Sequence, residues 1–589
     1  MSVVRHLFRK SSIFAGAFLL SVFLAGCQQA DSGVPSAFMS PQGLKAEAFL
    51  PQTTFVVFEL GAGNQQQQDA FNNLLKKFPS DDQQNFSQNV IQGFDKDLTT
   101  YNLDYQKDIV PAIGPNVRLF VGIEGTPSKQ TKPDVYVFVP LQDPSKMDAI
   151  FTDLLQGGSF TQQDYNGTPV LSKTSGSQYM ARVNDLLLIT NDADILKGAL
   201  DRQKSAQPSL IADATYQRTL QQLKPSVAFA YINVQGILNV LHQDPTSRTQ
   251  FEQAFGQLPS GNLIEAIQGE MFSAQAEDNG IHFYGAAYGD EEKMKTMEQN
   301  FSNLPSHQPY LYSRVPGNSV MAYFETYNLE KVINEDFQNW SGVKSFNDGL
   351  TQLKQSFTQI GLDFDNDFMP LFDQGVALNI HHDDSIVPSF AFYADVGNHP
   401  DAANKVMGKL KIIVDVLLKD IDAKIPDSPG LFTNEAVTVA GGQAYVVRLH
   451  LDKLNSQNSN LATLQLFLTQ PVEFWYGVTG DKLAFLALEP NFDQNYQTAQ
   501  KVSDDQNFQH VTSQLGGLKS GVMYMSPATF VGYLDKIVQL AHLGSPADSQ
   551  SSSDYDKVKS YLKPLTGAAF TTEAVSAGEA HFEGFLLIE

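Results

Sequence analysis

The residue with the clearest chemical assignment is Cys27, the only cysteine in the chain. It closes the sequence LAGC, which matches the bacterial lipobox, where small residues precede the cleavage point and the thiol accepts diacylglycerol. Basic residues and an apolar run over 13–25 come before it, and this run is too short to span a membrane comfortably. The sequence therefore predicts a lipoprotein signal peptide over residues 1–26 and a mature chain that begins with an acylated Cys27.

Acylation would anchor the chain, because two or three acyl chains such as palmitate hold a protein at a membrane more firmly than one. Without a second cysteine, the mature chain offers no disulfide, Cys-ligated zinc site or cysteine nucleophile. The residue after the lipobox is Gln28, not the Asp that marks inner-membrane retention. We therefore expect the outer membrane, facing the periplasm, if the cell has two membranes. Residues 27–48 are polar and contain Ser, Gly and Pro, so they are predicted to be a flexible tether.

A dense run of residue types that bind metals lies near the middle of the chain. It consists of His381, His382, Asp383 and Asp384. Adjacent strand residues point to opposite faces, so at most alternate members of this run could converge on one ion. The run also falls between two apolar strands, where a solvated loop is expected. The sequence thus predicts a plain loop, with at most weak metal binding, and no cofactor.

An acidic run that begins at Asp363 looks like the start of a calcium-binding EF-hand loop. The sixth and twelfth positions of such a loop need Gly and Glu, and here they are Phe368 and Gln374. Asp108 and Asp367 are instead predicted to be N-caps of short helical turns. The Gly-x-Ser-x-Gly, His-Glu-x-x-His and Walker sequences do not occur in the chain.

The elements that must position these residues occur twice. The pattern Leu-Asp-aromatic-x-x-Asp-hydrophobic-x-Pro in residues 103–111 returns in residues 362–370, at an offset of 259. Five further anchors follow the same order in both halves, including a Pro before the first strand, a strand-to-helix step and a hairpin turn. The hairpin turns at Asn184-Asp185 in the first half and at Gly480-Asp481 in the second. This order of anchors predicts a tandem duplication of one module.

The two copies are expected over residues 49–292 and 313–589, with a linker over 293–312. Short β-rich runs and the turn dipeptides favour antiparallel hairpins. Helical stretches are too few and too irregular for a doubly wound parallel sheet. The fold class predicted for each copy is therefore α+β, with a largely antiparallel β-sheet packed with helices.

The repeated element, the Pro before the first strand, the strand-Asp-Pro-helix step and the Asp-containing hairpin turn together carry a family resemblance. The chain resembles a family of bacterial exported proteins known as domain of unknown function 3352, over residues 49–589. The resemblance implies an envelope location and an α+β fold. It implies no established activity, and it supplies no catalytic residues.

The chain of 589 residues carries 64 acidic and 40 basic side chains, a formal net charge of −24. Such a surface repels phosphate backbones, so nucleic acid is not expected as a partner. The reactive residues that both halves share are acids with roles in caps and turns, and one histidine each, His282 and His581. This pattern favours a non-enzymatic binding or structural protein whose partners are the membrane and an envelope protein or lipid. Two alternatives stay open: a carrier or chaperone for lipid or another apolar ligand, suggested by 41 phenylalanines, and an unrecognised hydrolase.

The lipobox gives the first testable prediction. Replacing Cys27 with Ala removes the thiol that accepts the diacylglycerol, and cleavage follows acylation. The variant should therefore accumulate as an uncleaved precursor that carries no label after growth with radioactive palmitate. Normal labelling of the Cys27→Ala variant would show that the anchor lies elsewhere.

Overall fold

The computed structural model covers the whole chain and divides into two compact units. Unit 1 contains residues 1–295 and 575–581, and unit 2 contains residues 296–574 and 582–589. The structure describes residues 38–61, 65–79, 98, 101–114, 118–125, 133–205, 207–246, 248–249, 265–293, 311–317, 319–325, 330–331, 333–334, 344–381, 389–424, 430–450, 453, 472–518, 521–544, 549–576 and 578–589. The signal peptide, Cys27 and most of the expected linker lie outside these residues. The division after Lys295 falls inside the expected linker of 293–312.

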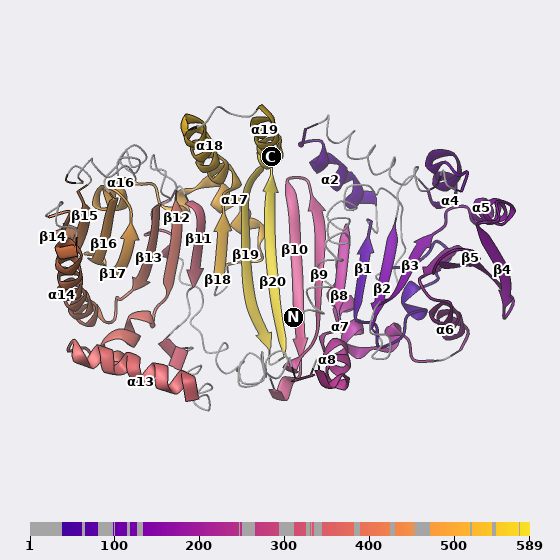
Figure 1. The fold of residues 1–589 in the computed structure, drawn as a ribbon, viewed down its shortest axis with the longest axis horizontal. Coiled ribbons are helices and arrows are strands. Elements are labelled where there is room, and N and C mark those ends of the chain that lie inside the picture. The colour runs from indigo at the N-terminus through magenta and orange to yellow at the C-terminus, as the bar shows by residue number, and fades with distance from the viewer. Residues whose placement is uncertain are drawn as a thin grey trace. The chain divides into compact units, whose positions relative to one another are not determined.

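Unit 1 alternates strands with short helices (Figure 1). Its strands are β1 (Val56–Leu60), β2 (Leu119–Glu124), β3 (Asp134–Pro140), β4 (Phe160–Tyr165), β5 (Thr168–Lys173), β6 (Tyr179–Val183), β7 (Leu186–Thr190), β8 (Ala228–Ile232), β9 (Ile267–Glu277) and β10 (Gly280–Gly289). Its helices are η1 (Ala46–Ala48), α2 (Gln65–Leu75), η2 (Tyr105–Ile109), α4 (Val110–Ile113), α5 (Pro144–Gln156), α6 (Ala193–Lys204), η3 (Leu210–Ala212), α7 (Ala214–Gln222) and α8 (Val234–Gln243). The strands pair in the order β4–β5–β6–β7–β3–β2–β1–β8–β9–β10, and every one of these pairs is antiparallel.

Unit 2 runs through a matching series of elements. Its strands are β11 (Ser319–Glu325), β12 (Val376–His381), β13 (Ser389–Asp395), β14 (Phe432–Val439), β15 (Gly442–Leu449), β16 (Val472–Val478), β17 (Leu483–Leu488), β18 (Gly521–Met525), β19 (Leu565–Ser576) and β20 (Glu579–Ile588). Its helices are α13 (Lys344–Gln359), η6 (Phe364–Phe368), η7 (Met369–Phe372), α14 (Pro400–Lys424), α16 (Phe492–Thr498), η9 (Val502–Asp504), α17 (Gln506–Gln514), α18 (Pro527–Gly544) and α19 (Ser549–Leu562). The pairing order β14–β15–β16–β17–β13–β12–β11–β18–β19 is again antiparallel throughout. The α+β fold class with a large antiparallel sheet is therefore confirmed.

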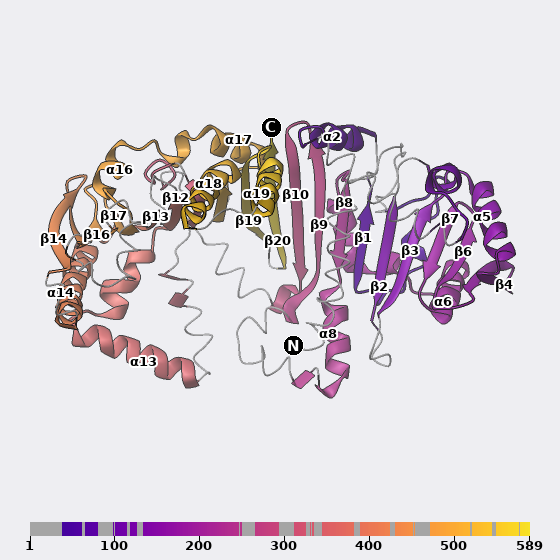
Figure 2. The same ribbon diagram turned by 45° about the horizontal axis from the view of Figure 1, so that its top comes forward.

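Each sheet is packed on both faces. In unit 2, one face of the sheet packs with α16, α17 and the segment before β11 in a single cluster of buried apolar residues. The opposite face packs with α13, η6, η7 and the first half of α14. Figure 2 shows α13 and α14 on one side of this sheet and α16 and α17 on the other. In unit 1, α6 and α7 cover one face, and α4 and α5 cover part of the other.

The repeated Leu-Asp motif forms the same local structure in both units, a single π-helical turn followed by a Pro-containing turn. The N-caps of the π turns are Asp104 and Asp363, whose carboxylates accept backbone N–H groups of the turn. Asp108 and Asp367 lie inside the turn and accept the N–H of Asp104 and Asp363, at 2.7 and 2.8 Å. The prediction that Asp108 and Asp367 are N-caps was wrong, because the π turn begins four residues earlier. The result is a reciprocal cap in which the two capping residues are four positions apart, one more than in the usual capping box.

Residues 38–50, which overlap the expected tether of 27–48, pack into unit 1. Phe38, Ala46 and Phe49 are fully buried there. Glu47 is also buried, and its carboxylate accepts hydrogen bonds from the backbone N–H of Phe38 and from the Tyr216 hydroxyl, both at 3.2 Å. The folded unit therefore begins about ten residues earlier than the composition of this segment indicated.

A second buried acid, Glu59 on β1, lies in the same core. Its carboxylate accepts a hydrogen bond from the guanidinium of Arg118 at 2.8 Å. Burial opposes ionisation more strongly than Arg118 favours it, and nearby Glu47 adds repulsion, so the pKa of Glu59 is raised to about 7. Unit 1 thus holds an acid that changes charge near neutral pH.

The reciprocal cap predicts a small, local contribution to stability. Asp367→Ala removes the acceptor for the Asp363 N–H and should lower the free energy of unfolding in urea by about 1 kcal/mol. Asp367→Asn keeps an acceptor and loses only the exposed ion pair with Lys405, so it should stay within about 0.5 kcal/mol of the parent. Equal losses in the two variants would assign the effect to the ion pair instead.

The raised pKa of Glu59 predicts a pH dependence of stability. Between the ordinary glutamate pKa of 4.5 and about 7, the unfolded chain releases this proton while the folded chain keeps it. The free energy of unfolding should therefore fall by about 3 kcal/mol over this range on account of Glu59 and then level off. Urea denaturation of the Glu59→Gln variant should lack this part of the slope, whereas exposed Glu265→Gln should retain it. A slope that is unchanged in Glu59→Gln would contradict the assignment.

Candidate functional site

The acids of the two shared hairpin turns hold the chain segment that enters each unit. In unit 1, the Asp185 carboxylate accepts hydrogen bonds from the Ser40 hydroxyl at 2.7 Å and from the Gln42 N–H at 2.6 Å. In unit 2, the Asp481 carboxylate accepts from the Arg314 guanidinium at 3.1 Å, just before β11 begins. Both contacts fasten the segment before the first strand of a unit to the hairpin turn of that unit.

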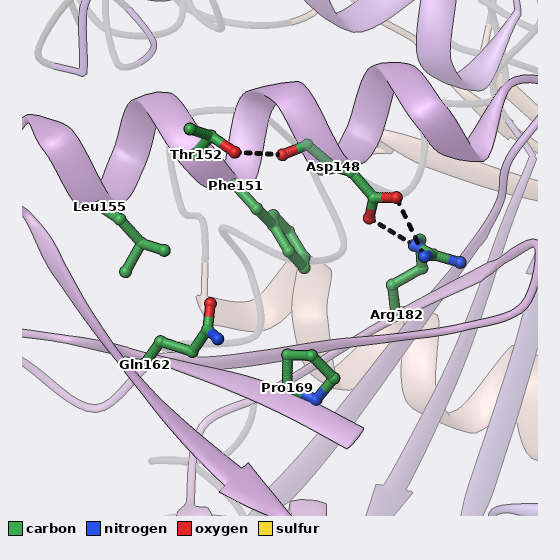
Figure 3. Close-up of a pocket in the computed structure, with 7 residues that line it drawn as sticks. All are labelled: Asp148, Phe151, Thr152, Leu155, Gln162, Pro169 and Arg182. Carbon is green, nitrogen blue, oxygen red and sulfur yellow. Dashed lines mark hydrogen bonds and ion pairs between the residues drawn. The ribbon is translucent and has the colours of Figure 1, made fainter. Parts of the chain in front are cut away.

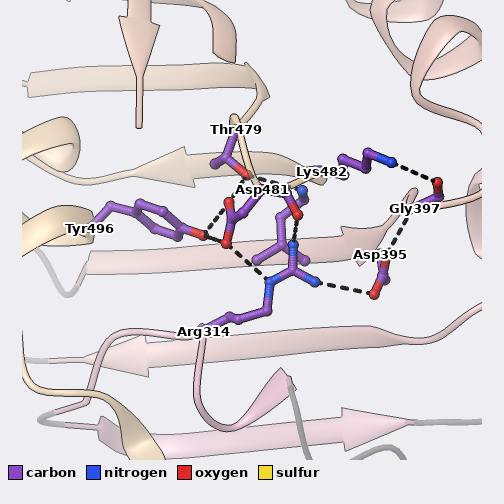
Figure 4. A network of polar contacts seen from close by, with 8 residues as sticks. Arg314, Asp395, Gly397, Thr479, Asp481, Lys482 and Tyr496 are labelled. Carbon is purple, nitrogen blue, oxygen red and sulfur yellow. Dashed lines mark hydrogen bonds and ion pairs between the residues drawn. The ribbon is translucent and has the colours of Figure 1, made fainter. Parts of the chain in front are cut away.

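The Asp481 contact belongs to a wider network (Figure 4). Arg314 also reaches Asp395 at 3.2 Å, and the Tyr496 and Thr479 hydroxyls donate to Asp481. Burial alone would raise the pKa of Asp481, but these donors and the charge of Arg314 outweigh it and lower that pKa. Every group here is matched by an opposite charge or a donor, which is the arrangement of a structural clamp.

The shared histidines each pair with a glutamate in their own hairpin. The imidazole of His282 lies 3.2 Å from Glu277, and that of His581 lies 2.6 Å from Glu579. Glu579 also pairs with Arg218. Burial opposes the charge on Glu579, but His581 and Arg218 together lower its pKa. These pairs stabilise the hairpins and place no nucleophile beside a base.

His381 is the only weak metal candidate that the structure describes; His382, Asp383 and Asp384 lie outside the described residues. The expectation of a solvated loop was wrong for His381, which ends β12 and is 6% exposed. Its Nε2 lies 3.1 Å from Oε1 of Glu489, which is 1% exposed. The ring makes no hydrogen bond to that oxygen, so the two groups are in close contact without one. Within the described residues, no three His, Cys, Asp or Glu side chains are grouped to hold a metal ion.

The His381–Glu489 pair is part of a buried polar row that crosses unit 2. Strand register places Ser319 on β11 opposite His381, and His381 opposite Ser389 on β13. Directly paired residues of antiparallel strands point to the same face. Glu489 follows Leu488, the partner of Phe390, and so lies next to Ser389 in the row. A hydroxyl, an imidazole and a carboxylate thus share one line, which the widely separated positions of these residues in the sequence concealed.

This row has the residue types of a hydrolase triad without its geometry. Among the described residues, the Ser319 hydroxyl has no hydrogen-bond partner, and it makes no hydrogen bond to His381. Ser319, His381 and Glu489 are all more than nine-tenths buried. A nucleophile must approach its base and be reached by substrate. The arrangement is therefore explained by packing.

The opposite face of the same strands carries two complete rows of apolar side chains. The first row, from β18 across to β17, is Met525, Met321, Ile380, Phe390 and Leu488. The second row, in the same strand order, is Met523, Tyr323, Leu378, Phe392 and Leu486. We call these ten side chains the apolar rows.

The apolar rows are partly open to solvent. Met525, Phe390 and Tyr323 are 38%, 38% and 37% exposed, and the remaining members are half-buried. Large apolar side chains that are contiguous and exposed commonly mark a binding surface. Apolar and polar residues do not alternate strictly in the sequences of these strands, a pattern typical of strands covered on both faces, so the sequence alone does not show that one face is partly uncovered.

A pocket of about 180 Å³ lies in unit 1 between α5 and the neighbouring strands (Figure 3). Its polar wall is the ion pair between Arg182 and Asp148, at 2.7 Å, and Phe151 and Pro169 form an apolar wall. Ligand pockets usually enclose about 300 Å³ or more. The pocket is thus smaller than a typical ligand site, and its one ion pair is already satisfied within the unit.

Among the helices that the structure describes, none has the length and apolar character needed to cross a membrane.

Comparison with known proteins identifies a family and no activity. The family model "Protein of unknown function (DUF3352)" matches residues 13–417, more than half of the chain. No curated protein matches the sequence. Two solved structures that match are crystal forms I and III of TP0453, at 10% and 8% identity. They align with 46% and 45% of this chain and with 89% and 90% of their own, at TM-scores of 0.23 and 0.24, which are too low to carry an argument. On the match over residues 13–417, this chain belongs to the DUF3352 family of proteins of unknown function.

Proposed function

We propose that this protein is a lipid-anchored envelope protein that acts by binding an apolar ligand. The single observation that carries the proposal is the pair of apolar rows on unit 2. Ten large apolar side chains lie on one face of five adjacent strands, and three of them are more than one-third exposed. Covering a Phe, Met or Leu side chain contributes about 1.5–3 kcal/mol when it becomes fully buried, so a ligand that covers this face gains affinity from several side chains at once.

Lipid acyl chains are the ligand that best fits this surface. The exposed members include Met525, whose flexible side chain adapts to a ligand of variable shape, and the large Phe390 ring. The Tyr323 hydroxyl donates to Glu325 within the unit, so the one polar group of the rows is already satisfied. A ligand without polar groups therefore leaves no hydrogen-bonding group of the rows unsatisfied when it covers them. This supports the carrier or chaperone role for lipid over recognition of a polar partner.

Unit 1 has a related apolar face. Its row crosses from Phe272 on β9 through Phe58 on β1 and Val121 on β2 to Val137 on β3. Phe272 is 44% exposed, and the other three are half-buried. The same surface type on the corresponding strands supports a role that both units share.

We also propose that the two units are copies of one module. The elements follow the same order in both, and the nine strand pairings of unit 2, including β19–β20, correspond one by one to those of unit 1. The π turn and the Asp clamp at the entry segment recur as well. Independent origins would have to reproduce the sequence anchors, the pairing order and these two local contacts together.

The proposed location is outside the cytoplasm, at a membrane that holds the acyl chains of Cys27. The LAGC sequence and the basic, apolar segment before it support this location, and Gln28 favours the outer membrane in a cell that has two. Only about ten residues separate Cys27 from Phe38, where the described part of unit 1 begins. Unit 1 is therefore held within about 35 Å of the anchor, the full extension of such a segment.

Binding rather than catalysis is proposed because the reactive side chains that both units share have roles in caps, clamps and hairpins. The Ser319–His381–Glu489 line is the strongest support for the alternative, a hydrolase confined to unit 2. The mature protein should show no turnover of ester, peptide, glycoside or phosphate substrates. Activity that disappears in both Ser319→Ala and His381→Gln, while the fold is retained, would establish the hydrolase instead.

The binding proposal is tested with the mature chain from residue 28 and the fluorescent fatty acid cis-parinaric acid. Phe390→Gln and Met525→Gln should each weaken binding roughly fivefold. Each substitution removes a partly exposed apolar side chain, and covering that side chain with the ligand contributes about 1 kcal/mol to the binding free energy. The control is Leu353→Gln on α13, which is 42% exposed and lies outside the apolar rows. It should bind as the parent does. Equal loss in all three variants would show that the probe adheres to any exposed apolar side chain.

A further inference from the structure

Helix α14 is much longer than the surface that packs against it. Its 25 residues extend for about 37 Å. Its first half buries Ala403, Val406 and Met407 against the sheet of unit 2. Beyond Gly408 none of its residues is fully buried, although the sequence continues as KLKIIVDVLLKDI. The second half of α14 is thus an apolar helix with an open side.

Four aliphatic side chains form a stripe on that open side. Ile412, Val416, Leu417 and Ile421 are 57%, 62%, 55% and 39% exposed. The first three are the most exposed large hydrophobic residues in the part of the chain that the structure describes. At about 100° per residue, the four side chains together span about half of the helix circumference, with Ile412 and Ile421 at its two edges. We call these four side chains the α14 stripe.

The polar contacts that tie α14 to the neighbouring strands lie on a different side of the helix from the α14 stripe. Asp415 accepts a hydrogen bond from Asn434 on β14 at 2.8 Å and pairs with Lys411. Lys411 in turn lies over the Tyr445 ring on β15, 6.0 Å from its centroid. These contacts fix the rotation of α14 about its axis. The α14 stripe consequently stays open because the helix is held, and the helix cannot roll to bury it.

Lysines frame the α14 stripe at each end. Lys409 precedes Ile412 by three residues, Lys419 follows Val416 by three, and Lys424 follows Ile421 by three. Side chains three residues apart are neighbours on a helix. Within the described residues, Lys409 and Lys419 enter no ion pair, whereas Lys424 pairs with Asp420, the one carboxylate that lies between the apolar residues.

This charge pattern departs from the rest of the chain. The whole chain has a net charge of −24, but α14 carries five lysines and four aspartates and is net positive. Aliphatic residues framed by lysines are typical of helices that lie in a membrane interface, where the ammonium groups reach anionic headgroups and the aliphatic groups enter the acyl region. The lysines and the aliphatic side chains of α14 therefore both fit the surface of an anionic lipid membrane.

We propose that the α14 stripe docks onto the anionic lipid surface of the membrane that anchors the chain. The proposal rests on the proposed function for its membrane anchor and extends it, because it assigns a second, non-covalent membrane contact to unit 2. In this arrangement α14 lies along the bilayer surface with Ile412, Val416, Leu417 and Ile421 inserted. Lys409 and Lys419 contact headgroup phosphates.

The test uses the mature chain from residue 28, without acyl groups, and flotation with phosphatidylglycerol–phosphatidylcholine vesicles. The parent should float with these vesicles and only weakly with pure phosphatidylcholine. The triple variant Ile412→Ser, Val416→Ser, Leu417→Ser should lose at least about tenfold in partition. The pair Lys409→Gln, Lys419→Gln should lose roughly fivefold per lysine, and the loss should shrink as salt rises.

A matched control comes from another helix with exposed apolar residues. Val558→Ser with Tyr561→Ser changes side chains on α19 that are 53% and 36% exposed, and it should float as the parent does. Equal loss in the control would overturn the proposal, as would flotation that is independent of anionic lipid. Circular dichroism of each variant keeps a folding defect separate from lost contact.

Two other occupants of the α14 stripe give distinct results. A photo-crosslinker at position 416 that captures residues 461–469 of the same chain, or a second copy of the protein, would overturn membrane docking.

Parinaric acid binding separates this proposal from the proposed function. The α14 triple variant should bind the probe as the parent does, so lost vesicle binding with retained probe binding isolates α14. Lost probe binding in Phe390→Gln with normal flotation isolates the apolar rows.

Discussion

The antiparallel register of each sheet is the constraint on which the rest of the structure depends. It places directly paired residues on one face, so the composition of each row is decided by residues that are far apart in sequence. In unit 2 the strands β11, β12, β13, β17 and β18 carry apolar residues on both faces. Both faces must then be covered by something. Helices α16 and α17 close one face. On the other face, α13, η6, η7 and α14 close only a part that includes Phe392 and Leu486, and the remaining members of the apolar rows are left over.

The buried polar row of unit 2 lies where β12 ends and β13 begins, and the matching end of the unit 1 sheet is polar as well. In unit 2 His381, the last residue of β12, pairs with Ser389, the first residue of β13. In unit 1 Glu124, the last residue of β2, pairs with Asp134, the first residue of β3. The Glu124 carboxylate accepts a hydrogen bond from the Tyr136 hydroxyl at 3.1 Å, whereas the His381 ring has no hydrogen-bond partner among the described residues. A buried polar group without a hydrogen bond costs free energy, so the two units meet the same constraint at this end of the sheet with different side chains and to different degrees.

Local features were predictable from the sequence, and contacts between distant segments were not. The hairpin turns, the two Pro-containing turns and the α+β class follow from residues that are neighbours in sequence, and the structure has them. Asp108 and Asp367 were assigned to the wrong cap position because a π turn shifts the start of the helix by four residues, and dihedral preference does not distinguish a π turn from an α turn. Phe38 and Glu47 were assigned to a tether because their surroundings are polar in sequence, although Tyr216 and the sheet surround them in space. His381 was assigned to a loop for the same reason, since its partner Glu489 is more than a hundred residues away.

The apolar surfaces of unit 2 have to be reconciled with a strongly acidic chain. A net charge of −24 repels an anionic bilayer at long range, but at physiological ionic strength that repulsion is screened beyond about 8 Å. The charges that matter at contact are therefore those next to the inserted side chains, and on α14 the five lysines outnumber the four aspartates. The acyl anchor proposed at Cys27 would change the balance further, because it would convert docking into an intramolecular step with an effective concentration near the millimolar range for a short tether. A helix contact too weak to recruit a free protein would then suffice to orient an anchored one. The acidity of the whole chain is compatible, for this reason, with the proposed membrane contact through one helix.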